Sequence, residues 1–114
     1  MLSSQDSVFA RLMAVIEDRK ANPPPKSYTT SLLQGGVAKI GAKITEEAKE
    51  VVEAASEPEA AGQAHLVYEA GDLIYHLFVL LAHRDIPLAE VETELARRFG
   101  VSGIIEKESR AAGD

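Results

Sequence analysis

The sequence contains two long stretches in which apolar residues recur at helical spacing, separated by one short break. The first covers residues 37–55 and the second runs from 59 to about 84, with Glu57-Pro58 between them. Proline lacks an amide hydrogen and its ring clashes with the preceding turn, so one helix cannot continue through this point. A short connection between two long amphipathic helices places them antiparallel and side by side. The sequence therefore predicts an all-α fold, a helical bundle built on two long antiparallel helices.

A shorter helix is predicted near the start of the chain. Residues 4 to about 20 carry apolar side chains at helical spacing, and Ser4 or Asp6 is placed to act as the N-cap. Consecutive prolines then end this helix because they cannot continue it. The proline-rich residues 22–26 form a stiff linker inside the domain, since too little chain precedes them to make a domain of its own.

Two further helices complete the pattern. A short helix after Ser27 is predicted to end at the glycine pair 35–36. Pro87 occupies a first-turn position of a last helix that ends at Gly100. The remaining residues, 101–114, form a polar tail that we expect to be less ordered.

Length and composition indicate a single domain that pairs with a second copy. A chain of 114 residues with 46% hydrophobic residues fits one globular domain over residues 1–114. Two long amphipathic helices in so short a chain leave apolar surface uncovered. A homodimer would bury that surface in a larger bundle.

Charge and residue types exclude several classes of function. The formal net charge of −6 argues against a nucleic-acid binder, which would present a basic surface. The absence of cysteine excludes disulfides, thiol nucleophiles and zinc–thiolate sites. No signal peptide is recognisable, and the apolar stretch 73–82 is too short to span a membrane. A soluble cytoplasmic protein is expected.

The first long helix carries acidic residues along one flank. Its predicted core face, at about 100° per residue, consists of Val37, Ile40, Ile44, Ala48, Val51 and Ala55. Glu47 lies at the edge of this face. Farther out on the same flank are Lys43, Glu50, Lys39 and Glu46. Like charges three or four residues apart destabilise an isolated helix by about 0.2–0.5 kcal/mol per pair.

The second long helix carries a polar stripe among apolar residues. His65, Glu69, Asp72 and His76 follow one another at spacings of four, three and four. A polar stripe with apolar neighbours tends to be buried or to line a cavity. We expect His76 to be a buried, hydrogen-bonded histidine, and His65 and His83 to be surface residues. The predicted core face of this helix consists of Leu66, Ala70, Leu73, Ile74, Leu77 and Leu81.

Antiparallel pairing of the helices brings the two acidic groups together. Glu47 and Glu50 can then face Glu69 and Asp72, and so many carboxylates repel one another unless a cation neutralises them. Magnesium prefers oxygen ligands and shares its sites with phosphate groups. The chain lacks both the repeated Glu-x-x-His of di-iron bundles and the zinc motif His-Glu-x-x-His. The residues alone leave two interpretations open: a divalent-metal site, or the solvated acidic stripe of a non-catalytic helical dimer.

The paired acidic motif resembles that of a known superfamily. It consists of Glu46-Glu47-Ala48-Lys49-Glu50 followed by Glu69-Ala70-Gly71-Asp72. This is similar to the motif of the all-α nucleoside triphosphate pyrophosphohydrolases, which bind magnesium with these carboxylates. Further segments, over residues 27–33, 39–43, 72–77, 94–98 and 102–110, narrow the resemblance to the phosphoribosyl-ATP pyrophosphohydrolase family of histidine biosynthesis. The likeness spans roughly residues 9–110.

The resemblance implies a magnesium-dependent hydrolysis of phosphoribosyl-ATP to phosphoribosyl-AMP and pyrophosphate. The implied metal ligands are Glu47, Glu50, Glu69 and Asp72, and Glu46 is a candidate for a fifth. Either Glu46 or Glu47 would orient the attacking water as a general base.

Basic side chains are the candidates for contacts with the substrate's phosphates. Lys39 and Lys43 lie on the flank of the acidic residues. Lys107 and Arg110 are weaker candidates because charged tails are usually solvated.

Two positions depart from the family pattern. Thr45 stands where glycine is usual, and Gly71 where alanine is commoner. Both are small residues, so the assignment holds. A house-cleaning pyrophosphohydrolase that acts on non-canonical nucleoside triphosphates with the same metal site is the alternative. Residues 27–33 and the basic tail argue against it.

Overall fold

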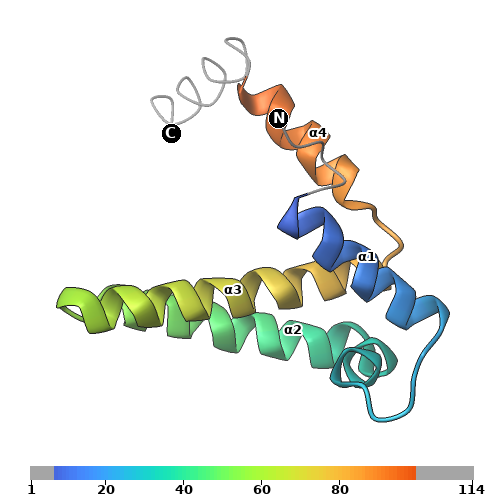
Figure 1. The fold of residues 1–114 in the computed structure, drawn as a ribbon, viewed down its shortest axis with the longest axis horizontal. Coiled ribbons are helices and arrows are strands. Elements are labelled where there is room, and N and C mark those ends of the chain that lie inside the picture. Colours follow the sequence, from blue (N-terminus) through green and yellow to red (C-terminus); the bar gives the residue numbers. More distant parts are fainter. Residues whose placement is uncertain (1–6, 100–114) are drawn as a thin grey trace.

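The structure, a computed structural model, describes residues 7–99, which form four helices and no strand (Figure 1). The helices are α1 (Val8–Ala21), α2 (Tyr28–Ala55), α3 (Glu59–His83) and α4 (Leu88–Phe99). Helices α2 and α3 lie antiparallel and side by side, and α1 packs across α3 (Figure 1). The predicted all-α fold on a long helical hairpin is confirmed.

Helix α2 begins as predicted and bends at the glycine pair. The Ser27 hydroxyl caps it by accepting a hydrogen bond from the Thr30 amide at 3.2 Å. Gly36 interrupts the helical backbone with φ 69° and ψ −164°, a conformation that residues with a Cβ rarely adopt. The short helix after Ser27 and the long helix from residue 37 are therefore two arms of one bent element.

The start of α1 differs from the prediction. Helix α1 begins at Val8, and its N-cap is Ser7, whose hydroxyl accepts a hydrogen bond from the Ala10 amide at 3.0 Å. The prediction of Ser4 or Asp6 as the cap is wrong. A cap must satisfy the free amides of the first turn, and only the residue directly before that turn reaches them.

The last helix begins one residue later than predicted. Helix α4 starts at Leu88, so Pro87 precedes the helix and accepts a hydrogen bond from the Glu90 amide at 3.0 Å. Helix α4 contains no buried residue and points away from the hairpin (Figure 1). Its predicted end at Gly100 and the tail 101–114 lie outside the described residues.

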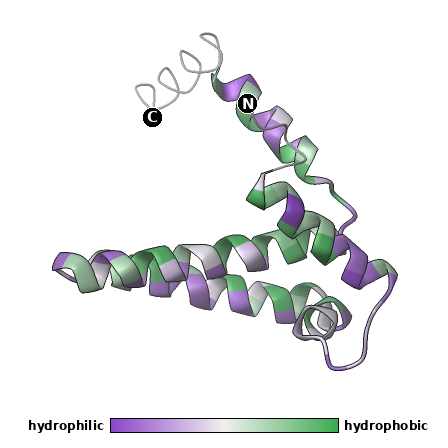
Figure 2. Cartoon of the chain, in the orientation of Figure 1, coloured by the Kyte–Doolittle hydropathy of each residue, from purple (hydrophilic) through white to green (hydrophobic). Residues whose placement is uncertain are grey.

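The core lies where α1 crosses the bent end of the hairpin. Hydrophobic residues dominate α3 in this region (Figure 2). The buried members are Met13, Ile16, Leu32, Ile40, Phe78, Val79 and Ala82. Lys20 secures this end because its ammonium group donates to the carbonyl oxygens of Ala82 and His83, both at 3.0 Å, and pairs with Asp85 at 2.7 Å.

The faces that α2 and α3 turn toward each other differ from the predicted core faces. On α2, the buried residues of the long arm are Ile40, Glu47 and Ala54. Val37, Ala48 and Ala55, three members of the predicted core face, are exposed. The buried positions are seven residues apart, the spacing of residues at the interface between two long packed helices. Glu47 lies within this interface rather than at its edge.

The predicted core face of α3 is only partly buried. Leu77 is 44% exposed, and the other five members are only partly buried. The side of α3 that packs on α2 instead carries Glu69 and His76, which are buried. By length and composition α3 is the one described helix that could cross a bilayer, a property that it shares with core helices of soluble proteins.

Candidate metal centre between α2 and α3

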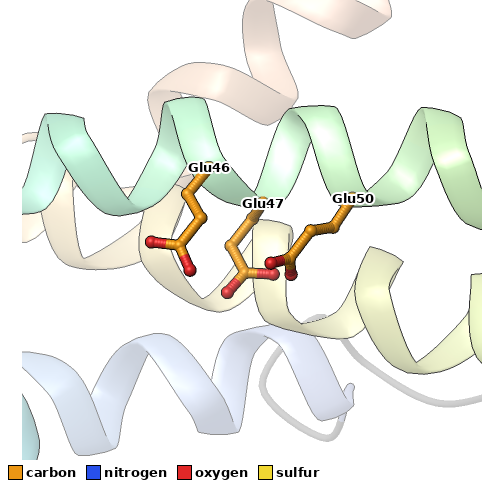
Figure 3. Close-up of side chains that lie close together, drawn as sticks. All are labelled: Glu46, Glu47 and Glu50. Carbon is orange, nitrogen blue, oxygen red and sulfur yellow. The ribbon is translucent and has the colours of Figure 1, made fainter.

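Five carboxylates from the two long helices meet at the middle of the hairpin. Ligand oxygens of Glu46, Glu47 and Glu50 lie within 4.8 Å of one another, and so do those of Glu47, Glu69 and Asp72. Figure 3 shows the three side chains of α2 projecting from one side of the helix, with their carboxyl groups close together. The structure thus brings together all five predicted acidic residues, and Glu47 belongs to both groups.

The two central carboxylates are buried without adequate partners. Glu47 and Glu69 are each only 7% exposed. One oxygen of each, Oε2, is buried and has no hydrogen-bond partner. An unpaired buried carboxylate oxygen is strongly unfavourable, and a divalent cation with oxygen ligands would compensate both. The residues present therefore fit a hard metal ion.

The proton affinities of the central carboxyl groups are shifted in opposite directions. Burial raises the pKa of Glu47 to about 7, helped by a hydrogen bond with Glu69 and by the negative charge of Asp72. The same hydrogen bond lowers the pKa of Glu69. A hydrogen bond with Glu69 also raises the pKa of Glu50. Without a metal ion the Glu47 carboxyl group is therefore mostly protonated below about pH 7 and mostly ionised above it.

His65 touches this cluster, although we predicted an ordinary surface position. Its Nε2 lies 3.3 Å from Glu69 Oε1, and its Nδ1 lies 2.9 Å from Glu57 Oε2. The Glu57 contact is the main reason that the pKa of His65 is raised. The four-residue spacing from Glu69 was the sequence signal for this contact. His65 is exposed, yet it is linked to the acidic cluster.

His76 is the buried, hydrogen-bonded residue that the sequence predicted. It is 4% exposed, and its Nδ1 lies 2.8 Å from the backbone oxygen of Asp72. A carbonyl oxygen only accepts, so Nδ1 carries a hydrogen and donates it to Asp72. Nε2 lies 3.0 Å from the hydroxyl of Tyr28, to which it is hydrogen-bonded. The individual role of Tyr28 was not predicted, because 48 residues separate it from its partner.

The predicted phosphate-binding lysines differ in position. Lys43 Nζ lies 3.8 Å from Glu46 Oε2, at the edge of the acidic cluster. Lys39 instead donates to the Ser31 hydroxyl at 2.6 Å, across the bend of α2. Lys107 and Arg110 lie outside the described residues.

A hollow of about 570 Å³ lies away from the carboxylates, at the ends of α1 and α3. It is lined by Glu17, Lys20, Ala21, Ala82, Asp85 and Pro87. Lys20, its central cation, is already engaged by two carbonyl oxygens and Asp85. These contacts join two helix ends, which is a structural role for Lys20.

Comparisons with known proteins agree on one family. Residues 9–99 match the family described as phosphoribosyl-ATP pyrophosphohydrolase. The chain is 58% identical over 102 residues to a phosphoribosyl-ATP pyrophosphatase of Rhodopirellula baltica, covering 90% of this chain and 85% of that protein. It is 49% identical over 109 residues to a protein of the same name from Trichlorobacter lovleyi, covering 96% and 98% of the two chains. A third, from Novosphingobium aromaticivorans, is 50% identical over 104 residues, covering 91% and 94%.

Proposed function

The chain belongs to the phosphoribosyl-ATP pyrophosphohydrolase family, and we propose that it performs the family's reaction with magnesium held by the carboxylates of α2 and α3. It is a hydrolase that converts phosphoribosyl-ATP to phosphoribosyl-AMP and pyrophosphate in histidine biosynthesis. The observation that carries the metal proposal is the pair of buried carboxylate oxygens, on Glu47 and Glu69, that have no partner.

Glu47, Glu50, Glu69 and Asp72 are the proposed ligands. Glu47 is central because its carboxyl group belongs to both groups of neighbouring ligand oxygens. Bound magnesium would neutralise charge on the phosphate oxygens and lower the pKa of a coordinated water. Glu50 is half-buried beside Glu47, and Asp72 is half-buried on the facing helix. Together these side chains would fix the triphosphate against the hairpin.

Glu46 is the better candidate for the general base. Its side chain is 54% exposed, whereas that of Glu47 is buried and shared between the two ligand groups. A base must accept a proton from a water that approaches the substrate, and an exposed carboxylate beside the ligands can do so. Lys43, next to Glu46, would bind a phosphate oxygen. Lys39, Lys107 and Arg110 are further candidates for the same role.

A homodimer would complete the bundle. Leu77 on α3 and Phe99 at the end of α4 are exposed apolar side chains in the single chain, with exposed fractions of 44% and 75%. Burying such surface is the dominant driving force for association. We propose that residues 1–114 form one domain that dimerises through this surface. With a net charge of −6 and a small nucleotide as its substrate, the enzyme would act in the cytoplasm without binding nucleic acid or membrane.

A substrate panel tests the assigned reaction. In magnesium buffer, phosphoribosyl-ATP should be hydrolysed with a far higher kcat/KM than any canonical or non-canonical nucleoside triphosphate. The reverse order would favour the house-cleaning alternative.

Thermal melting tests the metal site. Magnesium binding only the folded protein must raise the Tm, by mass action. The double variant Glu47→Gln/Asp72→Asn should stay folded and lose this response. If magnesium leaves the wild-type Tm unchanged and the double variant does not fold, the acidic stripe has a structural role instead.

A further inference from the structure

Tyr28, the first residue of α2, is a half-exposed aromatic side chain that the protein holds in one orientation. Its hydroxyl is hydrogen-bonded to His76 Nε2 at 3.0 Å. Its ring stacks on Tyr75, with centroids 6.3 Å apart and planes inclined by 21°. It also meets the ring of His76 at a centroid distance of 6.0 Å and an angle of 88°. Despite these contacts 51% of Tyr28 is exposed.

The partners of Tyr28 are themselves held in place. The hydroxyl of Tyr75 is hydrogen-bonded to Thr29, and His76 is fixed through its Nδ1 to the backbone oxygen of Asp72. Tyr75 and His76 also pack against each other, with ring centroids 5.0 Å apart. The exposed ring of Tyr28 therefore rests on a rigid support, and ordering it on binding a ligand would cost little conformational entropy.

The location of this ring links it to the carboxylates. Asp72 shares a group of ligand oxygens with Glu47 and Glu69. His76 follows Asp72 by four residues, about one turn of α3 and a rise of about 6 Å. Two hydrogen bonds, through His76, connect the hydroxyl of Tyr28 with the backbone oxygen of Asp72. A nucleotide whose phosphates lay on the carboxylates would need to extend its base by about one helical turn to meet this ring.

We propose that the exposed ring of Tyr28 is the platform on which the purine base of the substrate stacks, a role that rests on the proposed function. Stacking of a base on an aromatic side chain changes affinity by about 1–3 kcal/mol on substitution by alanine. That range corresponds to a factor of about 5 to 150. Tyr28 would thereby favour a nucleotide over a bare polyphosphate that satisfies the metal site equally well.

Steady-state kinetics with phosphoribosyl-ATP and magnesium test this role. Tyr28→Ala should lower kcat/KM by about 5- to 150-fold, mainly through KM. Tyr28→Phe keeps the ring and loses only the hydroxyl, so it should remain within about 3-fold of wild type. Phe9→Ala is the matched control: Phe9 is 53% exposed and packs on Phe78 of the same helix α3, with centroids 5.9 Å apart. It should leave the kinetics unchanged.

Two inhibitors separate base recognition from an effect on the metal site. In Tyr28→Ala, competitive inhibition by ATP should weaken by the same factor as kcat/KM, whereas inhibition by inorganic triphosphate should be unchanged. Equal weakening of both inhibitors would overturn the proposal, and so would kinetics of Tyr28→Ala that match those of Phe9→Ala. If Tyr28→Ala fails to fold, Tyr28→Leu supplies the same comparison with an apolar side chain that has no ring.

The test also distinguishes failure of the platform from failure of the assigned reaction. A wild-type protein that does not hydrolyse phosphoribosyl-ATP contradicts the assigned reaction. Calorimetric titration of wild type and Tyr28→Ala with ATP and with inorganic triphosphate, both with magnesium, then decides the role of Tyr28 alone. A loss confined to ATP supports the platform, and no difference between the proteins refutes it.

Discussion

Two properties of Glu47 favour opposite protonation states of its carboxyl group. It is buried in the seam between α2 and α3, which favours the protonated form. It also belongs to both groups of possible metal ligands, and a ligand must be ionised. The state of this residue therefore depends on whether a cation is bound.

The stability of the metal-free protein should fall as the pH rises from 5 to 8. The pKa of Glu47 is raised from 4.5 to about 7 on folding, so its contribution to stability is complete below pH 4.5 and is lost as the pH rises through 7. A shift of this size corresponds to a loss of at most about 3 kcal/mol. The lowered pKa of Glu69 changes stability only below pH 4.5, outside this range. A series of thermal melts in chelator measures it.

Magnesium should remove most of this pH dependence, since it replaces the proton. Glu47→Gln should flatten the profile in chelator. What slope remains there should come from Glu50 and His65, whose raised pKa values give stability that is likewise lost as the pH rises. A Tm that rises over this pH range in chelator would contradict the assignment.

Two lysines on α2 form a natural comparison for phosphate binding. Lys43 lies beside the acidic cluster, whereas Lys49 is 79% exposed and pairs with Glu53 at 3.9 Å. Lys43→Ala should lower kcat/KM by roughly 10- to 100-fold, the effect of losing a charge-assisted hydrogen bond. Lys49→Ala should leave it unchanged. Equal effects of the two substitutions would show that general charge, rather than a contact of Lys43, supports the reaction.

At the scale of the helices, two glycines of α3 have opposite roles. A methyl group on Gly62 would collide with the backbone carbonyl of Glu57, at the turn that joins α2 to α3. A methyl group on Gly71 would meet nothing within 4 Å. Only Gly62 is therefore required by the close approach of the backbone.

The two substitutions by alanine should change stability in opposite directions. Gly71→Ala should raise the free energy of unfolding by up to about 1 kcal/mol, because alanine is the better helix former. Gly62→Ala should lower it, because the turn must open to relieve the collision. Urea unfolding of both variants measures the difference. Stabilisation by Gly62→Ala would contradict the expected collision between the added methyl group and the Glu57 carbonyl.

The helices themselves could be predicted because their signals are local. Apolar periodicity and the breaks at Pro58 and the glycine pair 35–36 set the hairpin and its bend. The five carboxylates could be brought together from helix spacing alone. The residue at the centre of the interface between α2 and α3 could not be predicted. The apolar residues Ile44 and Ala48, which neighbour Glu47 on the helix, were the expected buried positions. Only the complete packing of α2 on α3 decides which residue is buried.

Contacts between residues far apart in the sequence could not be predicted from its patterns. The bond between Tyr28 and His76 spans 48 residues, and neither residue type indicates the other. Lys20 likewise reaches residues more than 60 positions away at the end of α3. Such contacts depend on how the helices pack, which no spacing along one helix encodes.

At the scale of the whole molecule, the exposed Leu77 on α3 leads us to predict a homodimer. Wild type should have about twice the 12.3 kDa mass of one chain in light scattering. Leu77→Glu should shift the mass toward that of the single chain, because a charge buried in an apolar interface is unfavourable. Val15→Glu is the control, since Val15 on α1 has a similar exposure of 48% compared with 44% for Leu77. A dimer that survives Leu77→Glu but not Val15→Glu would place the interface on α1.

The bend at Gly36 is the point from which the direction of the acidic side chains of α2 is set, relative to the arm that carries Tyr28. Eleven residues lead from Gly36 to Glu47, which is about three full turns of helix. Inserting one residue in this stretch would rotate every later side chain of α2 by about 100° relative to the arm that carries Tyr28. The carboxylates would then turn away from α3 while each helix remained intact. The number of residues between the bend and the acidic cluster therefore fixes both the side of α2 on which the carboxylates lie and their height along α3.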